Sequence, residues 1–166
     1  MEEIMADLSS MAASVGALLK QHRQTVAVAE SAAGGLISAS LIAVPGASAY
    51  YLGGAVVYTP TARQGLLRVP DHAMADMRAS TEPYALLKAR TVRELLGTVW
   101  GLSETGASGP TGNRYGDAAG HACIAVAGPI ERVITIEPGD VDREANMWKF
   151  ARGALGLLEQ CVRESN

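Results

Sequence analysis

The clearest pattern in the chain is a short apolar run, a glycine-containing turn and a second apolar run. Residues 25–29 are apolar and partly β-branched, which is typical of a buried strand. The residues 30–35, Glu-Ser-Ala-Ala-Gly-Gly, interrupt this run, and residues 36–44 continue it with the composition of a buried helix. Pro45-Gly46 then ends the helix. The sequence therefore predicts a strand, a tight turn and a helix here.

Similar patterns along the chain predict the other elements. Further helices are expected at residues 2–23, 62–67, 72–78, 82–96 and 141–162. Further strands are expected at residues 55–58, 98–105, 121–126 and 131–137, the last two as an antiparallel hairpin. The order αβαβααβββα predicts an α/β fold, namely a three-layer α/β/α sandwich with a mixed, partly parallel sheet. We expect residues 1–166 to form a single domain.

Three segments of this pattern follow strand ends. They are the turn 30–35, Tyr58 and the long glycine-rich loop 106–119. Ligands of such sheets gather at the carboxyl ends of strands, and a loop of this length is more often functional than not. We therefore expect the three segments to meet in one cleft.

The turn itself carries candidate chemistry. Backbone N–H groups at a helix N-terminus attract anions and can stabilise an oxyanion, and small residues let a ligand approach. Ser31 stands where a nucleophile or a phosphate-binding hydroxyl would stand. The alternative interpretation is a simple helix N-cap with a glycine-assisted turn, and local chemistry alone favours this alternative.

Composition narrows the function classes. The net charge is −3, the pI is about 5.6 and no Lys/Arg cluster occurs, so direct nucleic-acid binding is not expected. Cys123 and Cys161 lie far apart and are predicted to be buried apolar residues. The three histidines have no metal-ligand spacing, so neither a metal nor a cofactor is expected. The acidic N-terminus and the lack of a long apolar segment predict a cytoplasmic location without a membrane partner.

A nucleophilic serine needs a proton acceptor. The three lysines, Lys20, Lys88 and Lys149, fall on predicted helices away from strand ends. Arg63 follows the strand that ends at Tyr58, but a guanidinium cannot accept a proton. It can hold a phosphate, as can Arg143, although either could equally be a solvated surface residue.

Four motifs resemble one family when they are taken in order. They are Ala29-Glu30-Ser31-x-x-Gly34-Gly35-Leu36, Val44-Pro45-Gly46-x-Ser48, Tyr58, and Thr105-Gly106-x-x-Gly109-Pro110-Thr111-Gly112. Together they resemble the C-terminal domain of the CinA competence/damage-inducible proteins, whose stand-alone members include nicotinamide mononucleotide deamidases. We expect no counterpart of the separate molybdopterin-binding-like domain of full-length CinA within these 166 residues. The resemblance implies an α/β/α fold, a homo-oligomer (dimer), and hydrolysis of a nicotinamide carboxamide to the acid and ammonia.

The resemblance also implies roles for individual residues. Ser31 matches the proposed nucleophile, Tyr58 and Thr105 match residues of the site, and Arg63 occupies the position of the family's catalytic lysine. Backbone N–H groups around Ala32–Gly35 would hold the oxyanion, and the loop 106–112 with Arg63 or Arg143 would receive the nucleotide phosphate. The predicted substrate-binding residues are Glu30, Ala32, Ala33, Gly34, Gly35, Gly106, Gly109, Thr111, Gly112 and Arg143.

Several positions depart from the family pattern. Ala32 and Ala33 replace Cys and Thr, Pro60 replaces Asn, Arg63 replaces Lys, and Met147 replaces an Arg. The leading hypothesis is an amidohydrolase acting on nicotinamide mononucleotide or a related pyridine nucleotide. The alternatives are a catalytically impaired domain that binds a nucleotide or phosphate ligand, and an interaction module in a competence or DNA-damage response.

Overall fold

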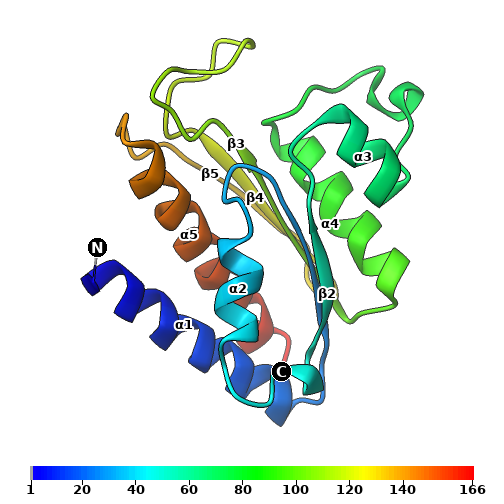
Figure 1. The fold of residues 1–166 in the computed structure, drawn as a ribbon. Helices are drawn as coiled ribbons and strands as arrows, with labels where there is room; N and C mark the ends of the chain where they lie inside the picture. Colours follow the sequence, from blue (N-terminus) through cyan, green and yellow to red (C-terminus); the bar gives the residue numbers. More distant parts are fainter. Residues whose placement is uncertain (1) are drawn as a thin grey trace.

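Five strands form one mixed sheet in the order β2-β1-β3-β4-β5 (Figure 1). The computed structural model describes residues 2–166, with side chains from Asp7 onward. The strands are β1 (Val26–Glu30), β2 (Tyr51–Val56), β3 (Trp100–Gly106), β4 (Ala122–Ala127) and β5 (Arg132–Ile136). The pairs β1·β2 and β1·β3 are parallel, whereas β3·β4 and β4·β5 are antiparallel. The predicted partly parallel sheet is confirmed.

Helices cover both faces of this sheet, which confirms the three-layer α/β/α architecture (Figure 1). One layer consists of α1 (Glu2–Gln21), α2 (Leu36–Ile42) and α5 (Arg143–Glu164). The other consists of α3 (Pro60–Leu67) and α4 (Glu82–Leu96). Two short 3₁₀ segments, η1 (Ala47–Ala49) and η2 (Asp71–Met74), lie in the connections. Among the described residues, no helix is both long enough and apolar enough to cross a bilayer.

Side chains alternate between the two layers along the central strands. Val26 and Val28 of β1 join the core formed with α1, α2 and α5, whereas Ala27 and Ala29 face the other layer. The residues toward α4 are small because this helix packs close to the sheet. At Gly101 a Cβ atom would lie 1.9 Å from the carbonyl oxygen of Ala89, so only glycine fits there.

The predicted strand at residues 55–58 was placed too late in the chain. β2 spans Tyr51–Val56 and includes Gly53 and Gly54, which suggest a loop when only the sequence is considered. A Cβ atom on Gly54 would lie 2.7 Å from the carbonyl oxygen of Val28, so close packing requires this glycine inside the strand. Tyr58 therefore lies just beyond the sheet rather than within it.

Other predicted boundaries were also revised. The predicted helix at residues 72–78 is only the 3₁₀ segment η2, and the helix at residues 36–44 ends at Ile42. The helix at residues 82–96 has the predicted bounds, because Thr81 caps its first turn and Gly97 adopts the left-handed conformation after it. The predicted buried cysteines are confirmed as buried free thiols.

Removal of α5 should abolish folding. Phe150, Leu155 and Leu158 are completely buried on this helix, and burial of each such side chain stabilises a protein by roughly 1.5–3 kcal/mol. Their sum is comparable with the whole stability of a small domain, about 5–15 kcal/mol. A chain that ends at Asp142 should show no cooperative thermal transition by circular dichroism. A soluble truncated protein with a cooperative transition would contradict this assignment.

Candidate active site

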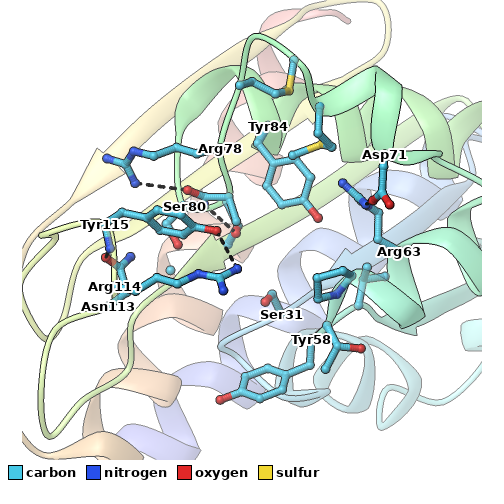
Figure 2. A pocket seen from close by; sticks show the side chains of 18 residues that line it. Ser31, Tyr58, Arg63, Asp71, Arg78, Ser80, Tyr84, Asn113, Arg114 and Tyr115 are labelled. Carbon is cyan, nitrogen blue, oxygen red and sulfur yellow. Dashed lines mark hydrogen bonds and ion pairs between the residues drawn. The ribbon is translucent and has the colours of Figure 1, made fainter.

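A cleft of about 620 Å³ opens at the carboxyl ends of β1, β2 and β3 (Figure 2). Ser31 follows β1, Tyr58 follows β2 and Thr105 lies at the end of β3, and all three line the cleft. Arg63 and Gly106 line it as well. The expectation that separate strand ends meet in one cleft is therefore confirmed for these residues.

Two buried carboxylates hold the turn between β1 and α2. The Glu30 Oε2 atom accepts the N–H groups of Gly35 at 2.8 Å and Ile37 at 3.1 Å, and its Oε1 atom accepts that of Ser38 at 2.7 Å. From β3, the Glu104 Oε2 atom accepts the N–H groups of Ser31 at 3.0 Å and Ala33 at 2.8 Å. Both carboxylates are completely buried. The first turn of α2 is thus stabilised from inside the protein.

This arrangement corrects the expected anion cradle. The N–H groups of Ala33 and Gly35 donate to carboxylates, and that of Gly34 donates to the Ser31 carbonyl oxygen at 3.1 Å. The expectation of free N–H groups is therefore wrong for these three residues. Ala32 keeps an N–H group for which the described part of the chain offers no acceptor, and it is the remaining backbone candidate for an oxyanion.

A buried lysine lies against the same strand end. Lys88 on α4 is completely buried, and its Nζ atom donates to the backbone oxygen of Glu104 at 2.6 Å. The expectation that Lys88 lies away from the strand ends is therefore wrong. Burial lowers the pKa of Lys88 to about 8, although Glu104 and Glu30 act in the opposite direction. Burial likewise raises the pKa of Glu104, against the effects of Lys88 and of the two N–H donors. Lys88, Glu104 and Glu30 form the buried charge cluster beneath the turn.

Arg63 is a fixed cation in the wall of the cleft. Thr59 caps α3 by accepting the N–H group of Ala62 at 3.1 Å, and Pro60 occupies the first turn, which places Arg63 at the cleft. Its side chain is about nine-tenths buried and forms an ion pair with Asp71. The Nε atom of Arg63 is itself buried and has no hydrogen-bond partner among the described residues.

Arg143 lies beside the cleft rather than in its lining. Its guanidinium donates to the Tyr58 hydroxyl at 2.9 Å and to the Gly109 carbonyl at 2.6 Å. It therefore joins the start of α5 to the end of β2 and to the glycine-rich loop. Of the ten predicted substrate-binding residues, only Gly106 is among the described residues that line the cleft. The other nine lie outside this lining: Glu30, Ala32, Ala33, Gly34, Gly35, Gly109, Thr111, Gly112 and Arg143. Met147 packs on Gly34, where a Cβ atom would lie 2.8 Å from its methyl group.

Comparison with known proteins decides the family. The model of the CinA C-terminal domain matches residues 8–162 of the chain. The chain belongs to the CinA C-terminal domain family.

Related sequences and solved structures agree with this assignment. The CinA-like protein of Gloeobacter violaceus is 42% identical over 135 residues, which are 81% of this chain and 32% of that protein. The one of Salinibacter ruber is 38% identical over 146 residues, 88% of this chain and 35% of that protein. This CinA domain thus spans about a third of the length of these relatives. A CinA superfamily protein from Klebsiella pneumoniae has the same fold, with a TM-score of 0.88, 23% identity, and coverage of 95% of this chain and 98% of that one. CihA from Agrobacterium tumefaciens has a TM-score of 0.84 and 25% identity, with 95% and 96% covered.

The cleft of the CinA domain also contains residues that sequence reasoning missed. They come from the segment before α4, from the first turn of α4 and from the glycine-rich loop, and include Arg78, Ser80, Tyr84, Asn113, Arg114 and Tyr115. In the segment before α4 the sequence predicted only a short helix at residues 72–78, and in the loop 106–119 it drew attention to the length and the glycines. Only the arginine and tyrosine side chains within the loop could have indicated a binding role.

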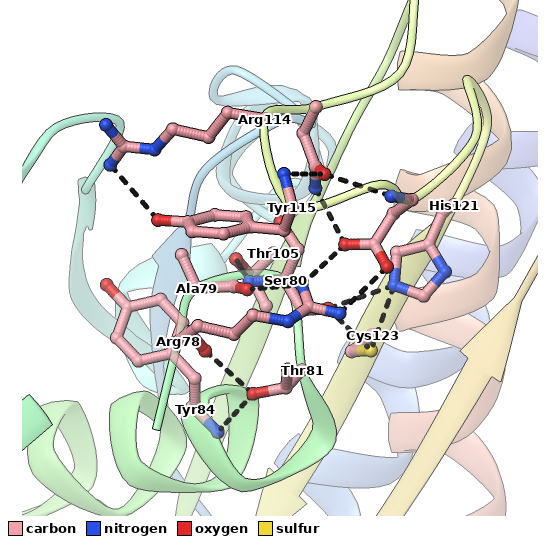
Figure 3. A network of polar contacts seen from close by, with 12 residues as sticks. Arg78, Ala79, Ser80, Thr81, Tyr84, Thr105, Arg114, Tyr115, His121 and Cys123 are labelled. Atoms are coloured by element: carbon pink, nitrogen blue, oxygen red, sulfur yellow. Dashed lines mark hydrogen bonds and ion pairs between the residues drawn. The ribbon is translucent and has the colours of Figure 1, made fainter. Parts of the chain in front are cut away.

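His121 supports one of these lining residues (Figure 3). Its Nδ1 atom lies 2.9 Å from a Glu137 carboxylate oxygen, and its Nε2 atom lies 2.9 Å from the carbonyl oxygen of Ser80. Ser80 has a φ of 60° and donates its N–H group to the Thr105 hydroxyl at 3.2 Å. Burial alone would lower the pKa of His121, but these two acceptors, with Asp117 nearby, raise it overall. His121 thus acts as a structural residue, and the described residues contain no cluster of three His, Cys, Asp or Glu that could hold a metal.

Proposed function

We propose that the cleft binds a pyridine mononucleotide and that Ser31 hydrolyses its carboxamide. The observation that carries this proposal is the position of Ser31 in the lining of a large cleft, together with Tyr58 and Thr105, in a domain of the CinA family. The cleft is large enough for a mononucleotide, since ligand pockets commonly have volumes of 300–1,000 Å³. Its lining includes the guanidinium groups of Arg63, Arg78 and Arg114, whereas the chain as a whole is acidic.

The proposed reaction has two steps. The Ser31 Oγ atom forms an ester bond with the carboxamide carbon and the C–N bond breaks. The proton of the serine hydroxyl passes to the leaving nitrogen, which departs as ammonia. Water then hydrolyses the ester, which releases the carboxylic acid and restores the serine. The Ala32 N–H group is the proposed backbone donor to the oxyanion. Thr105 accepts the Ser80 N–H group, so its own proton is free to be donated to the ligand.

Removal of the Ser31 hydroxyl proton is the step for which the cleft lining is least suited. Ser31 needs a base, but the basic residues in the described lining are the arginines 63, 78 and 114, which stay protonated. Lys88 has a lowered pKa but is outside the described lining of the cleft, with its Nζ atom 5.4 Å from the centre of the Tyr84 ring that lines it. We therefore expect a slow enzyme rather than an efficient one.

Ammonia release tests the proposal. The purified chain should convert nicotinamide mononucleotide to nicotinate mononucleotide and ammonia at a slow but measurable rate. Removal of the nucleophile in Ser31→Ala should abolish the activity without altering the fold, because Ser31 is only partly buried. Equal rates for both proteins would assign the activity to another group.

The missing base favours a second candidate function, which is ligand binding without turnover. In that case nicotinamide mononucleotide should raise the thermal stability of the native protein while no ammonia appears. A ligand at 100 times its dissociation constant stabilises a folded protein by about 2.7 kcal/mol. A thermal shift without product would establish this candidate, and product formation would reject it.

A further inference from the structure

The glycine-rich loop places a cationic side chain over the opening of the cleft. Figure 2 shows the Arg114 side chain extending from the loop toward Ser31, with its guanidinium over the cleft. Tyr115 and Asn113 of the same loop also line the cleft. The loop is therefore part of the binding wall and not only a connection between β3 and β4.

An aromatic ring fixes the position of this cation. The guanidinium carbons of Arg114 and Arg78 each lie 5.1 Å from the centre of the Tyr115 ring, one above it and one below it (Figure 3). Such contacts are attractive because a cation interacts with the negative face of the ring. Arg114 also donates to the Tyr115 hydroxyl at 3.1 Å. Both ring faces are occupied, so the ring positions Arg114 and does not stack on a ligand base.

The loop holds this arrangement in place before any ligand binds. The Asn113 side-chain oxygen accepts the N–H groups of Tyr115 at 3.0 Å and Asp117 at 3.1 Å. The Asn113 amide donates to the Asp117 carboxylate at 2.8 Å, and that carboxylate binds Arg78 at 2.6 and 2.9 Å. Arg78 and Asn113 hold the pKa of Asp117 at about 2, against a smaller effect of burial, so this support stays charged at neutral pH. A group positioned in advance binds its ligand with a smaller entropic cost.

Arg114 differs from the other lining arginines in its charge balance. Arg63 is paired with Asp71 and Arg78 with Asp117. Arg114 has no carboxylate partner among the described residues, and its interactions there are those with Tyr115. A guanidinium has five N–H donors in a planar fork that matches phosphate oxygens. Most of these donors on Arg114 are available to a ligand.

We propose that Arg114 binds the phosphate monoester of the nucleotide, and that the cleft thereby selects phosphorylated over unphosphorylated ligands. This inference rests on the proposed function, because it names the residue that would hold the phosphate of the ligand in the same cleft. Arg78 and Tyr115 are positioning residues for Arg114, and the base and carboxamide remain directed toward Ser31.

Calorimetric affinities for nicotinamide mononucleotide and nicotinamide riboside test this inference in native, Arg114→Gln and Tyr115→Leu proteins. Arg114→Gln should weaken binding of the mononucleotide roughly ten- to hundredfold and leave riboside binding unchanged, because one charge-assisted contact is lost. Tyr115→Leu should cause a smaller loss, about two- to fivefold, of the same selectivity. The control is Arg152→Gln, which removes an exposed arginine of α5 that pairs with Asp7 of α1 and is not in the cleft lining.

An unchanged ratio of the two affinities in Arg114→Gln would overturn the inference, even if the protein hydrolyses the mononucleotide. Binding of mononucleotides with other bases, weakened by Arg114→Gln, would support the phosphate site while rejecting pyridine specificity. Failure of the native protein to bind any mononucleotide at millimolar concentration would overturn both proposals.

Discussion

Replacement of Arg63 by lysine should raise the rate of ammonia release from nicotinamide mononucleotide by up to about 10²- to 10⁴-fold, the usual contribution of a general base. The guanidinium of Arg63 remains protonated, whereas a lysine in this position, about nine-tenths buried, can lose its proton near neutral pH. The family resemblance places a lysine at this position. The gain should stay below the upper limit because Ala32, Ala33 and Pro60 also depart from the family pattern.

The ion pair with Asp71 provides a control for this prediction. Asp71 would favour a protonated lysine at position 63, although its side chain is 77% exposed and its effect is screened by water. Arg63→Lys/Asp71→Asn should therefore be somewhat faster than Arg63→Lys. Ligand affinity should change much less than rate, because both side chains are cationic. A fast native enzyme that Arg63→Lys slows would show that the arginine itself has a positive catalytic role.

Replacement of Lys88 by methionine should destabilise the protein by about 3–5 kcal/mol at neutral pH. Lys88 is the cation of the buried charge cluster, and its loss leaves the completely buried Glu104 and Glu30 with backbone N–H donors but without a cation. Chemical denaturation measures the difference. Lys149→Met is the matched control, since it removes a partly exposed pair with Asp140 and should cost less than about 1 kcal/mol.

The loss of unfolding free energy caused by Lys88→Met should also depend on pH. Burial raises the pKa of Glu104 above its ordinary value, and removal of Lys88 should raise it further. A carboxyl with a raised pKa in the folded state contributes its stability below the unfolded pKa and loses it as the pH rises through the folded pKa. The deficit should therefore be smaller at pH 5 than at pH 8, and Lys88→Met/Glu104→Gln should recover part of it. A deficit that is independent of pH and of Glu104 would show that lost packing is its only cause.

The bounds of helices and strands were predicted best from the sequence where local chemistry determines them. Thr81 and Gly97 are sufficient to define the ends of α4, and the apolar run before Glu30 defines β1. The meeting of Ser31, Tyr58 and Thr105 followed from the rule that parallel strand ends share one edge of the sheet. β2 was misplaced because its glycines serve close packing with β1, which no local signal reveals.

The support of the site depends on contacts between distant residues, and these could not be predicted. Glu104 binds a turn that lies 71 to 73 positions earlier in the chain, and it thereby occupies the Ala33 N–H group, one of those expected to hold an anion. The role proposed for Arg114 depends on the Tyr115 ring, which also contacts Arg78, a residue in an irregular segment. A list of the glycines in the loop gives no indication of this stack.

The role of Ser31 is tested most directly by ammonia release from nicotinamide mononucleotide in the Arg63→Lys background, with and without Ser31→Ala. Arg63→Lys should release ammonia faster than the native protein, and Ser31→Ala/Arg63→Lys should release none above the uncatalysed rate while it still binds the nucleotide. Equal release by the two variants would contradict the assignment of Ser31 as the nucleophile of this cleft.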